Sequence, residues 1–292
     1  MITFSELGRH GRLGNQLFQY AALKSIALEN GYVCKIPNPA AMEWHGQKCL
    51  LSEFNIEASF LEPHDLSSIE RNVIEPSHHY FFKDFFHIPD NSNIHGYFQS
   101  TYYFNKHKDQ ICKELTPAHK YISKANEFLN FLRADGSEVV SIHLRRGDNI
   151  DGTNLNEKYL SFYGKNDIYD KDSIYGQYIS QALAKFGDRK VKFLVFSGGS
   201  RTGDDKEDIL WAKNTFKKEN FFVSETNSAM EDFSLMMLCD HNITCHLTTF
   251  GWWAAYLNPN PNKTIIAPKN YFYDEKEEYV RPGFFPASWT II

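Results

Sequence analysis

Apolar residues recur along this chain with strand and helix periods in alternation. A short apolar segment, Ile2 to Phe4, predicts a strand, and Asn15 to Asn30 predicts a helix with a broad apolar face. Gly31 follows that face, at a position where helices commonly end in the left-handed conformation. The glycine-punctuated stretch between them, Gly8 to Gly14, is therefore expected to join a strand to a helix start.

The second half of the chain has the more regular pattern. It predicts strands at 139–145, 191–197, 221–223, 242–245 and 263–267, and helices at 173–186, 205–218 and 228–238. His143 and Arg145 share one face of the first of these strands, because side chains alternate along a strand. The stretch 149–172 is expected to be a polar loop. Strands that alternate with helices at this spacing indicate a parallel α/β sheet.

The first half is harder to interpret. Residues 32–132 are interrupted by prolines and rich in aromatic residues, and only a helix at 118–132 is predicted there. The length of 292 residues corresponds to about two domains. The predicted fold class is α/β, with two Rossmann-like domains facing a cleft. The expected domains are 1–135 and 136–292, with the chain end able to pack back on the first.

Composition and charge exclude several classes of protein. The sequence is 42% hydrophobic and 23% charged, which argues against a disordered or membrane-embedded chain. Its 31 Lys and Arg against 36 Asp and Glu give a net charge of −5, so no nucleic-acid partner held by bulk charge is expected. Any anionic ligand must therefore be bound by a few well-placed cations.

Nothing in the sequence predicts secretion or a membrane span. The first residues carry no basic region followed by an apolar stretch, and no apolar run approaches the ~18 residues of a membrane helix. The five cysteines are widely spaced and form no C-x-x-C pair. A reduced, cytoplasmic protein is expected, although a chain trimmed of an anchor would look the same, and peripheral membrane association stays open.

The histidines and acids do not form a metal-site pattern. No H-E-x-x-H occurs, and His78 and His79 are adjacent rather than one helical turn apart. Asp204 and Asp205 are likewise adjacent and are expected to cap the following helix. The sequence therefore predicts an activity that needs no metal.

The strongest candidate for chemistry is the segment His143-Leu-Arg-Arg-Gly-Asp148, which ends a predicted strand. Its two arginines point in alternate directions, so that one can reach a ligand while the other pairs with a carboxylate. A guanidinium offers several fixed donors and therefore suits a diphosphate, which gains charge as it leaves. The alternative is a cluster of surface salt bridges, which is the more common role of an isolated R-R-x-D.

Two further segments are weaker candidates. Thr248 to Leu257 follows a predicted strand and opens a helix, and a helix start attracts phosphate. The alternative is a plain capped helix with a tryptophan-rich core face, which is favoured for Trp252 and Trp253. The turn Gly11 to Gln16 allows close backbone approach, but it matches neither a Walker A loop nor G-x-G-x-x-G.

Taken together, these segments resemble glycosyltransferase family 11, the α-1,2-fucosyltransferases. The matching motifs, in the order of the family, are G-x-L-G-N-Q (11–16), G-Y-[FW]-Q-S (96–100), H-x-R-R-x-D (143–148), F-S before an acidic helix (196–197 and 204–211) and F-[SG]-W-W-A-A (250–255). Each motif alone is unspecific, whereas the set is specific.

The resemblance implies a fold of the GT-B type and a defined reaction. The donor would be GDP-β-L-fucose, used without a metal or other cofactor and with inversion to an α-fucoside. The acceptor would be an oligosaccharide or glycoconjugate, fucosylated at O-2 of a terminal galactose. The first domain would be the acceptor side, and the second domain would bind the nucleotide sugar.

The resemblance also assigns site residues. Arg145 would clamp the diphosphate, with His143 and Arg146 beside it, and Asn15 would lie at the donor–acceptor junction. The other expected donor contacts are Gly14, Ser197, Asp204, Thr248, Thr249 and Phe250.

Arg145, Asp148 and Asn15 are the expected catalytic residues. Asp148 and Asp151 are the candidate general bases for the acceptor hydroxyl. Asp148 is equally well suited to holding an arginine or the loop, so the identity of the base stays open.

Two other functions fit the same residues. One is a fucosyltransferase that acts on another acceptor position, and linkage analysis of the product distinguishes it. The other is a non-catalytic module that binds a glycan or a nucleotide. Release of GDP from GDP-fucose in the presence of acceptor separates the enzyme from that module.

Overall fold

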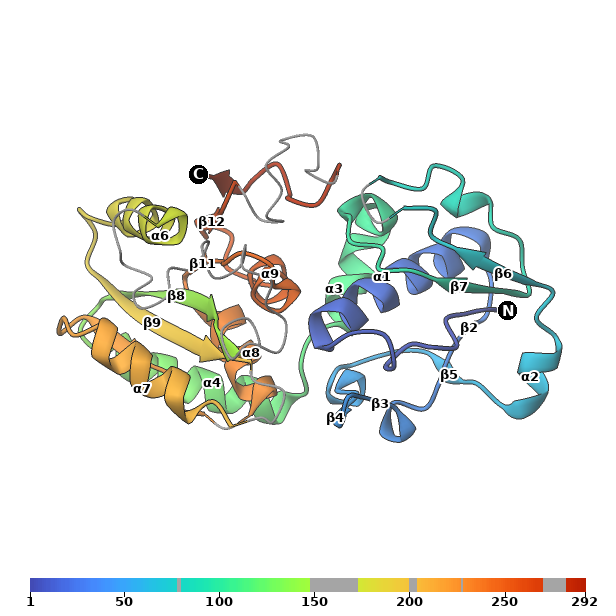
Figure 1. Cartoon of the computed structure of the whole chain (residues 1–292), viewed down its shortest axis with the longest axis horizontal. Helices are drawn as coiled ribbons and strands as arrows, with labels where there is room; N and C mark the ends of the chain where they lie inside the picture. The colour runs from blue at the N-terminus through green and yellow to red at the C-terminus, as the bar shows by residue number, and fades with distance from the viewer. Residues whose placement is uncertain (78–79, 148–172, 200–203, 227, 270–281) are drawn as a thin grey trace. The chain divides into compact units, whose positions relative to one another are not determined.

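The computed structural model describes residues 1–77, 80–147, 173–199, 204–226, 228–269 and 282–292, which fall into two α/β units (Figure 1). The first unit comprises Met1–Ala118 and residues 282–287, and the second comprises the other described residues from His119 onward. The polar loop expected at 149–172 lies outside the described residues. Each unit has its own parallel sheet, in agreement with the predicted fold class.

The sheet of the first unit has the order β5-β2-β1-β7-β6, with all described pairs parallel. Its strands are β1 (Ile2–Thr3), β2 (Cys34–Ile36), β5 (Ser59–Phe60), β6 (Arg71–Ile74) and β7 (Ser92–His95), and β3 (Glu43–Trp44) and β4 (Gln47–Lys48) form a separate antiparallel pair. The helices are α1 (Leu13–Asn30), α2 (Pro63–Ser67) and α3 (Lys108–Glu114), with 3-10 turns η1 (Pro39–Ala41), η2 (Leu51–Glu53), η3 (Phe85–His87), η4 (Thr101–Tyr103) and η5 (Asn105–His107).

The first strand and the first helix confirm the sequence prediction. α1 begins two residues earlier than expected and ends at Gly31, which is left-handed and donates its N–H to the carbonyl of Ala27. The helix is buried along most of its length, with Leu17 and Phe18 fully inaccessible to solvent. Burial of such side chains contributes about 1.5–3 kcal/mol each, so α1 is the main core element of this unit.

The sheet of the second unit has the order β10-β9-β8-β11-β12-β13, again with parallel pairs. Its strands are β8 (Glu138–Arg145), β9 (Val191–Gly198), β10 (Phe221–Val223), β11 (His241–Ile243), β12 (Ile265–Ala267) and β13 (Thr290–Ile291). Its helices are α4 (His119–Leu132), α6 (Ile174–Ala184), α7 (Lys206–Thr215), α8 (Ala229–Leu238) and α9 (Thr249–Tyr256). The predicted strands and helices of this half are therefore confirmed, and α7 ends three residues before the expected position.

The central strand β8 is covered on both faces. Val140 and Ile142 are fully buried in the cluster that includes Tyr178 of α6. On the opposite face, the Ser141 hydroxyl accepts a hydrogen bond of 2.7 Å from the side-chain amide of Asn242. Because both faces are covered, only the carboxyl end of β8 can present side chains to a ligand.

The division between the units falls at residue 118, whereas the sequence pattern placed it at 135. The difference is α4, which packs against α8 of the second unit. Its apolar stripe, which includes Leu129, is buried there, and Lys124 forms an ion pair of 2.6 Å with Glu231. The amphipathic helix thus belongs to the sheet that follows it in the chain.

The chain end contributes to both units, as the sequence analysis allowed. The Ser100 hydroxyl donates to the Pro282 carbonyl at 2.6 Å, and the ring of Phe284 stacks on Phe18 at 6.1 Å between centroids. The last strand, β13, then pairs with β12 of the second sheet.

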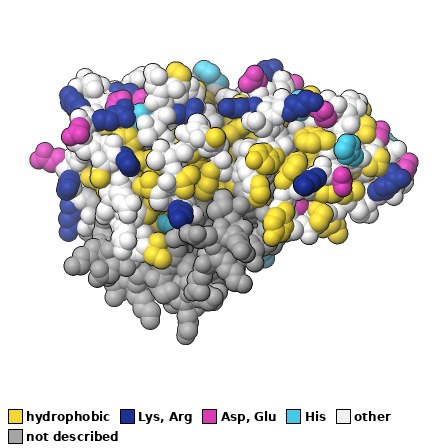
Figure 2. Space-filling model, turned by 90° about the horizontal axis from the view of Figure 1, so that it is seen from above, with side chains coloured by type: hydrophobic (Ala, Val, Ile, Leu, Met, Phe, Trp, Pro, Cys, Tyr) yellow, Lys and Arg dark blue, Asp and Glu magenta, His cyan; other side chains and the backbone are white. Residues whose placement is uncertain are grey.

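Charge is dispersed over the described part of the face shown in Figure 2. On the face shown in Figure 2, Lys and Arg side chains are scattered among acidic and uncharged ones and form no continuous basic area. This distribution agrees with the small net charge of the sequence. In the part of the chain that the structure describes, no helix is both long and apolar enough to cross a bilayer.

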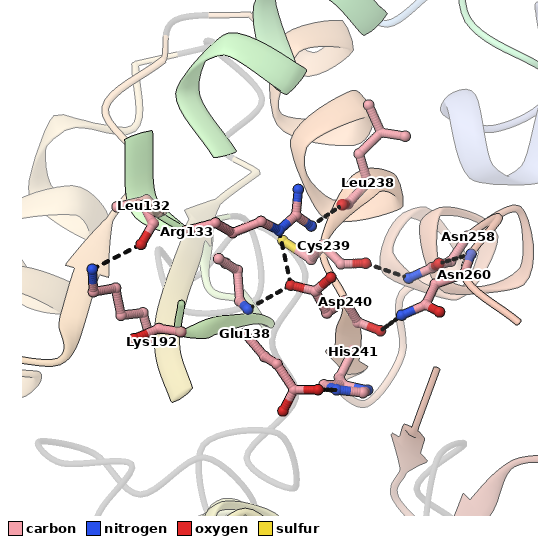
Figure 3. A network of polar contacts seen from close by, with 12 residues as sticks. Leu132, Arg133, Glu138, Lys192, Leu238, Cys239, Asp240, His241, Asn258 and Asn260 are labelled. Carbon is pink, nitrogen blue, oxygen red and sulfur yellow. Dashed lines mark hydrogen bonds and ion pairs between the residues drawn. The ribbon is translucent and has the colours of Figure 1, made fainter. Parts of the chain in front are cut away.

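The amino end of the second sheet is held by a polar network (Figure 3). The Asp240 carboxylate accepts hydrogen bonds from the Arg133 guanidinium at 3.0 Å and from the Val139 N–H at 2.7 Å. Asn258 and Asn260 cap the same turn through the carbonyls of Cys239 and Asp240. This edge therefore fixes where β8 and β11 begin.

We expect Asp240→Ala to lower the free energy of unfolding by about 1–3 kcal/mol, because two buried or half-buried donors lose their acceptor. The matched control is Asp188→Ala, an exposed acid whose loss should change stability by less than about 0.5 kcal/mol. Urea unfolding measures both. Equal unfolding midpoints for Asp240→Ala and the wild type would contradict this role.

Candidate functional site

The direction in which successive strands are added to the second sheet reverses between β8 and β11, although these two strands are parallel. β9 and β10 extend the sheet from one edge of β8, whereas β11, β12 and β13 extend it from the other. Ligands of open parallel sheets bind at the carboxyl ends of the strands where such a reversal leaves a crevice. The segments at that place are 143–147, which ends β8, and 244–250, which follows β11.

The start of α9 packs against the end of β8. The rings of His143 and Phe250 lie 5.7 Å apart, and a Cβ added to Gly251 would overlap the His143 imidazole. Only glycine therefore fits at 251. Burial, together with the charge of Arg145, lowers the pKa of His143 to about 3, so this ring is neutral at physiological pH.

Cys245, two residues after the neighbouring strand β11, contacts the end of β8. Its sulfur accepts the Arg145 backbone N–H at 3.2 Å and lies 3.8 Å from Nδ1 of His143. Burial raises the pKa of the Cys245 thiol to about 12, so it is a protonated structural group and not a nucleophile.

The Arg145 side chain lies across the end of β9. A Cβ added to Gly199 would overlap the Arg145 guanidinium, and Gly199 has a φ of +103°. The Gly199 N–H donates to the Asp205 carboxylate at 2.8 Å, which fixes the turn in this conformation. The guanidinium thus packs directly against the Gly199 backbone, which follows the carboxyl end of β9.

Arg146 has a different environment. Its Nε donates to Asp208 at 2.9 Å, and its guanidinium carbon lies 3.8 Å from the centre of a Trp211 ring. The second carboxylate oxygen of Asp208 accepts the Gly147 N–H at 2.9 Å. Arg146 therefore pairs with a carboxylate, and it links the turn after β8 to α7. A direct contact between Arg146 and a donor stays a prediction.

The N-terminus of α9 lies at the same edge as Arg145. Thr248 is its buried N-cap residue, in extended conformation, and its hydroxyl forms no capping hydrogen bond. Thr249 and Phe250 form the first turn, whose N–H groups and dipole favour an anion. The preceding Leu247 has a φ of +54°, which is strained for a branched side chain and is typical of functional sites.

Ser197 and Asp204, two other predicted donor contacts, differ in burial: the Ser197 hydroxyl is buried and Asp204 is exposed. Ser197 is the second-last residue of β9, and its buried hydroxyl has no hydrogen-bond partner among the described residues. Asp204 is exposed, and its carboxylate accepts the Lys206 N–H at 3.2 Å and lies 3.5 Å from the Lys206 ammonium. Asp205 rather than Asp204 contacts the glycine turn, so a donor contact for Asp204 stays a prediction.

In the first unit, two of the sequence motifs meet. The turn after β1 leads into α1, where Gly14 is buried in the first turn. The Asn15 side-chain carbonyl accepts a hydrogen bond of 2.8 Å from Gln99, which follows β7. The Gln16 amide closes the turn by donating to the Gly11 carbonyl at 2.9 Å. Asn15 is therefore held at the carboxyl ends of β1 and β7.

A family model described as glycosyl transferase family 11 matches residues 4–292. The chain belongs to this family.

Curated relatives agree with this assignment. The O-antigen biosynthesis glycosyltransferase WbnK of Escherichia coli is 24% identical over 90% of this chain and 93% of its own. The galactoside alpha-(1,2)-fucosyltransferase 2 of Bos taurus is 30% identical over 85% of this chain and 67% of its own. The chain is a fucosyltransferase of family 11, which excludes the non-catalytic binding module.

Solved structures show the fold. NodZ alpha-1,6-fucosyltransferase, co-crystallised with GDP, aligns with a TM-score of 0.52 over 88% of this chain and 92% of its own, at 12% identity. POFUT1 in complex with GDP aligns with a TM-score of 0.51 over 90% and 97%, also at 12% identity. The family 11 enzyme therefore has the two-unit GT-B fold that its sequence motifs implied.

One acidic residue of the family 11 enzyme was missed in the sequence. Asp232 lies in the first turn of α8, where its Oδ1 accepts the hydroxyls of Ser224 at 2.6 Å and Thr226 at 2.8 Å. Burial raises the pKa of Asp232 to about 6 despite these bonds. Ser224 directly follows β10, so this carboxyl group also lies at the carboxyl edge of the sheet. In the sequence it is indistinguishable from an ordinary acid at a helix start.

Two other predictions concern the base and the metal. Asp148 and Asp151 lie outside the described residues, so their role as general base stays a prediction. Within the described ranges, no three His, Cys, Asp or Glu side chains are grouped as metal ligands.

We expect Gly199→Ala to reduce transfer strongly, because the new methyl group displaces the Arg145 guanidinium. Gly136→Ala is the matched control, because Gly136 also has a positive φ, of +79°, but open space around its Cβ position. Both variants should lose stability through backbone strain, and only Gly199→Ala should lose more than about tenfold in kcat/KM. Steady-state kinetics of the two purified proteins compares them, and equal activities would contradict the placement of Arg145.

Proposed function

We propose that this family 11 enzyme transfers L-fucose from GDP-β-L-fucose to O-2 of a terminal galactose in a glycan, with inversion to an α-1,2-fucoside. The observation that carries the proposal is that Arg145 and the N-terminus of α9 share the carboxyl end of the β8–β11 pair. The relatives named galactoside alpha-(1,2)-fucosyltransferase support the linkage, and the GDP complexes of the structural neighbours support the donor. A cytoplasmic location is part of the proposal.

The proposed role of these groups is to bind the diphosphate more tightly as it leaves. The guanidinium of Arg145 offers a fixed set of N–H donors, and the first turn of α9 adds backbone N–H groups and a positive dipole end. Both are already positioned by packing, so little reorganisation accompanies the reaction. Groups of this kind lower the barrier only if they favour the departing anion over the bound substrate.

The proposed step is a single displacement. The acceptor oxygen forms a bond to the anomeric carbon from the face opposite the leaving group. The bond between that carbon and the phosphate oxygen breaks, and its electron pair leaves with GDP. The hydroxyl proton passes to a general base, for which Asp148 is our proposal from its position directly after Gly147 in the sequence.

Positive charge from the protein makes a divalent cation unnecessary in this proposal. Arg145 and α9 occupy the role that a metal ion plays where a nucleotide sugar is bound by acidic residues. Transfer should therefore continue in the presence of a chelator. The first unit, which carries Asn15, is the proposed acceptor side.

Asp232 is the proposed contact for the base of the nucleotide. Guanine presents two adjacent N–H groups on one edge, and a carboxylate is their natural acceptor. Oδ1 of Asp232 is held by Ser224 and Thr226, so the carboxylate has one orientation. Burial strengthens such a hydrogen bond and penalises its loss.

For Arg145→Ala we expect kcat/KM to fall by about 10²–10³-fold, as for loss of one preorganised donor to a developing oxyanion. Arg189→Ala is the matched control, because Arg189 pairs with Glu138 at the opposite end of the same strand. Release of GDP from GDP-fucose, measured with a galactose-ended acceptor with and without chelator, tests the proposal. Near-wild-type turnover of a folded Arg145→Ala protein would remove the mechanism.

The affinity for GDP should decrease as pH falls through about 6, because Asp232 then gains a proton and can no longer accept both N–H groups. Asp232→Asn should lack this step and keep only the pH dependence of the phosphate itself. Calorimetry between pH 5 and 7.5 makes the comparison, with ADP as the control nucleotide. Identical pH profiles for the two proteins would exclude Asp232 as the base contact.

The main alternative is transfer to another acceptor position. The name of the structural neighbour NodZ specifies an alpha-1,6 linkage, so the fold itself does not select the linkage. Linkage analysis of the fucosylated product decides between the two.

A further inference from the structure

In the sheet of the first unit, the direction in which strands are added likewise reverses, between β1 and β7, although these two strands are parallel. β2 and β5 extend it from one edge of β1, whereas β7 and β6 extend it from the other. A ligand of this unit is therefore expected beside the segments 8–15 and 96–99, which follow these two strands. The motif at 96–100 lies there. Its first residues have no part in the donor site described above.

Three rings form a cluster at this place. The centroid of the His10 ring lies 4.6 Å from that of His95 and 4.6 Å from that of Tyr97, and the rings of both pairs are tilted relative to each other. All three side chains are half-buried, and the buried ring of Phe4 contacts His95 at 5.4 Å between centroids. Aromatic rings that are partly accessible to solvent are suited to the apolar C–H face of a sugar.

The ring cluster is held by buried polar groups and not by ring contacts alone. The Gln19 amide, which is fully buried, donates to the His10 carbonyl at 2.8 Å and to the Gly96 carbonyl at 3.3 Å. It thereby joins the two loops that carry the rings. The Tyr97 N–H donates to Glu75 at 2.8 Å, so the backbone of the second loop is fixed as well.

The backbone beside the ring cluster is strained. Phe98 has a φ of +49°, which is unusual for an aromatic residue and persists only where its surroundings enforce it. The comparable residue at the donor site is Leu247, with a φ of +54°. A strained residue therefore follows the strand at the reversal point of each sheet.

The electrostatics favour a neutral ligand. Burial, together with the neighbouring His95, lowers the pKa of His10, which favours the neutral imidazole with one donor and one acceptor nitrogen. The amides of Asn15 and Gln99 lie at the same strand ends. Glu6 and Arg9 are both exposed nearby in the sequence and have opposite charges. Sugar hydroxyls match such uncharged donors and acceptors better than a carboxylate does.

We propose that the rings of His10, His95 and Tyr97, with Asn15, form the subsite for the terminal sugar of a neutral glycan acceptor. This inference rests on the proposed function, because it names where that acceptor is bound. Tyr97 and His10 are binding residues in it, and Gln19 is a positioning residue.

The test uses lactose as a neutral probe and sialyllactose as an anionic one. Tyr97→Ala should weaken lactose binding about tenfold, whereas Tyr97→Phe, which keeps the ring, should stay within about twofold of the wild type. The control is Phe60→Ala, a half-exposed ring on β5 at the far edge of the same sheet. Lactose binding is measured by saturation-transfer NMR, and GDP binding, measured by calorimetry, should not change in any variant.

Kinetics with GDP-fucose provides the second readout, in which Tyr97→Ala should raise the KM for lactose and leave that for GDP-fucose unchanged. Lactose binding that a folded Tyr97→Ala protein retains, or that the wild type lacks, would overturn the subsite. Preference of the wild type for sialyllactose would overturn the neutral ligand. Failure of the wild type to turn over GDP-fucose would instead contradict the proposed function, and the NMR result would still decide the subsite.

Discussion

The packing of α9 against the end of β8 is the constraint on which the donor site depends. Gly251 lets the first turn of the helix approach His143. The sulfur of Cys245, just after β11, accepts a hydrogen bond from the Arg145 N–H. A guanidinium and a helix N-terminus are thereby fixed at one end of one strand pair. Fixed charges of this kind can act on a departing anion without reorganising, which is what electrostatic catalysis requires.

The two ends of the second sheet have different tasks. The amino end is a network of satisfied polar groups around Asp240, which defines the position of β8 (Figure 3). The carboxyl end contains the features that cost stability: a left-handed Leu247, the Gly198–Gly199 turn and a Ser197 hydroxyl that has no hydrogen-bond partner among the described residues. Strain at one edge of a sheet that is offset by stabilising interactions at the other edge is typical of an enzyme scaffold.

The sequence predicted the second unit well because its strands and helices are long and strongly patterned. It predicted little of residues 32–132, where the strands have two to four residues and most turns are 3-10 helices, too short for periodicity to be recognised. It also placed α4 in the first domain, whereas this helix packs against α8 of the second unit. The positions of Arg145 at the end of a strand and of Phe250 at the start of a helix could be predicted because these residues end or follow apolar segments.

Other parts of the site depend on tertiary contacts that no local pattern shows. Asp232 has the sequence context of a helix cap, and only burial beside Ser224 gives it a perturbed pKa. The environment of Arg146 depends on Asp208 and Trp211, which lie some sixty residues later in the chain. Likewise, the ring cluster around His10 requires β1 and β7 to be neighbours. The sequence could not indicate this pairing.

The most direct test of the central claim separates the diphosphate from the rest of the nucleotide. Dissociation constants of GDP and of guanosine, measured by calorimetry in chelator for the wild type and Arg145→Ala, give the contribution of the diphosphate in each protein. The account predicts that the preference for GDP over guanosine is large in the wild type and mostly lost in the variant. An undiminished preference in a folded variant would show that Arg145 does not bind the diphosphate and would contradict the account.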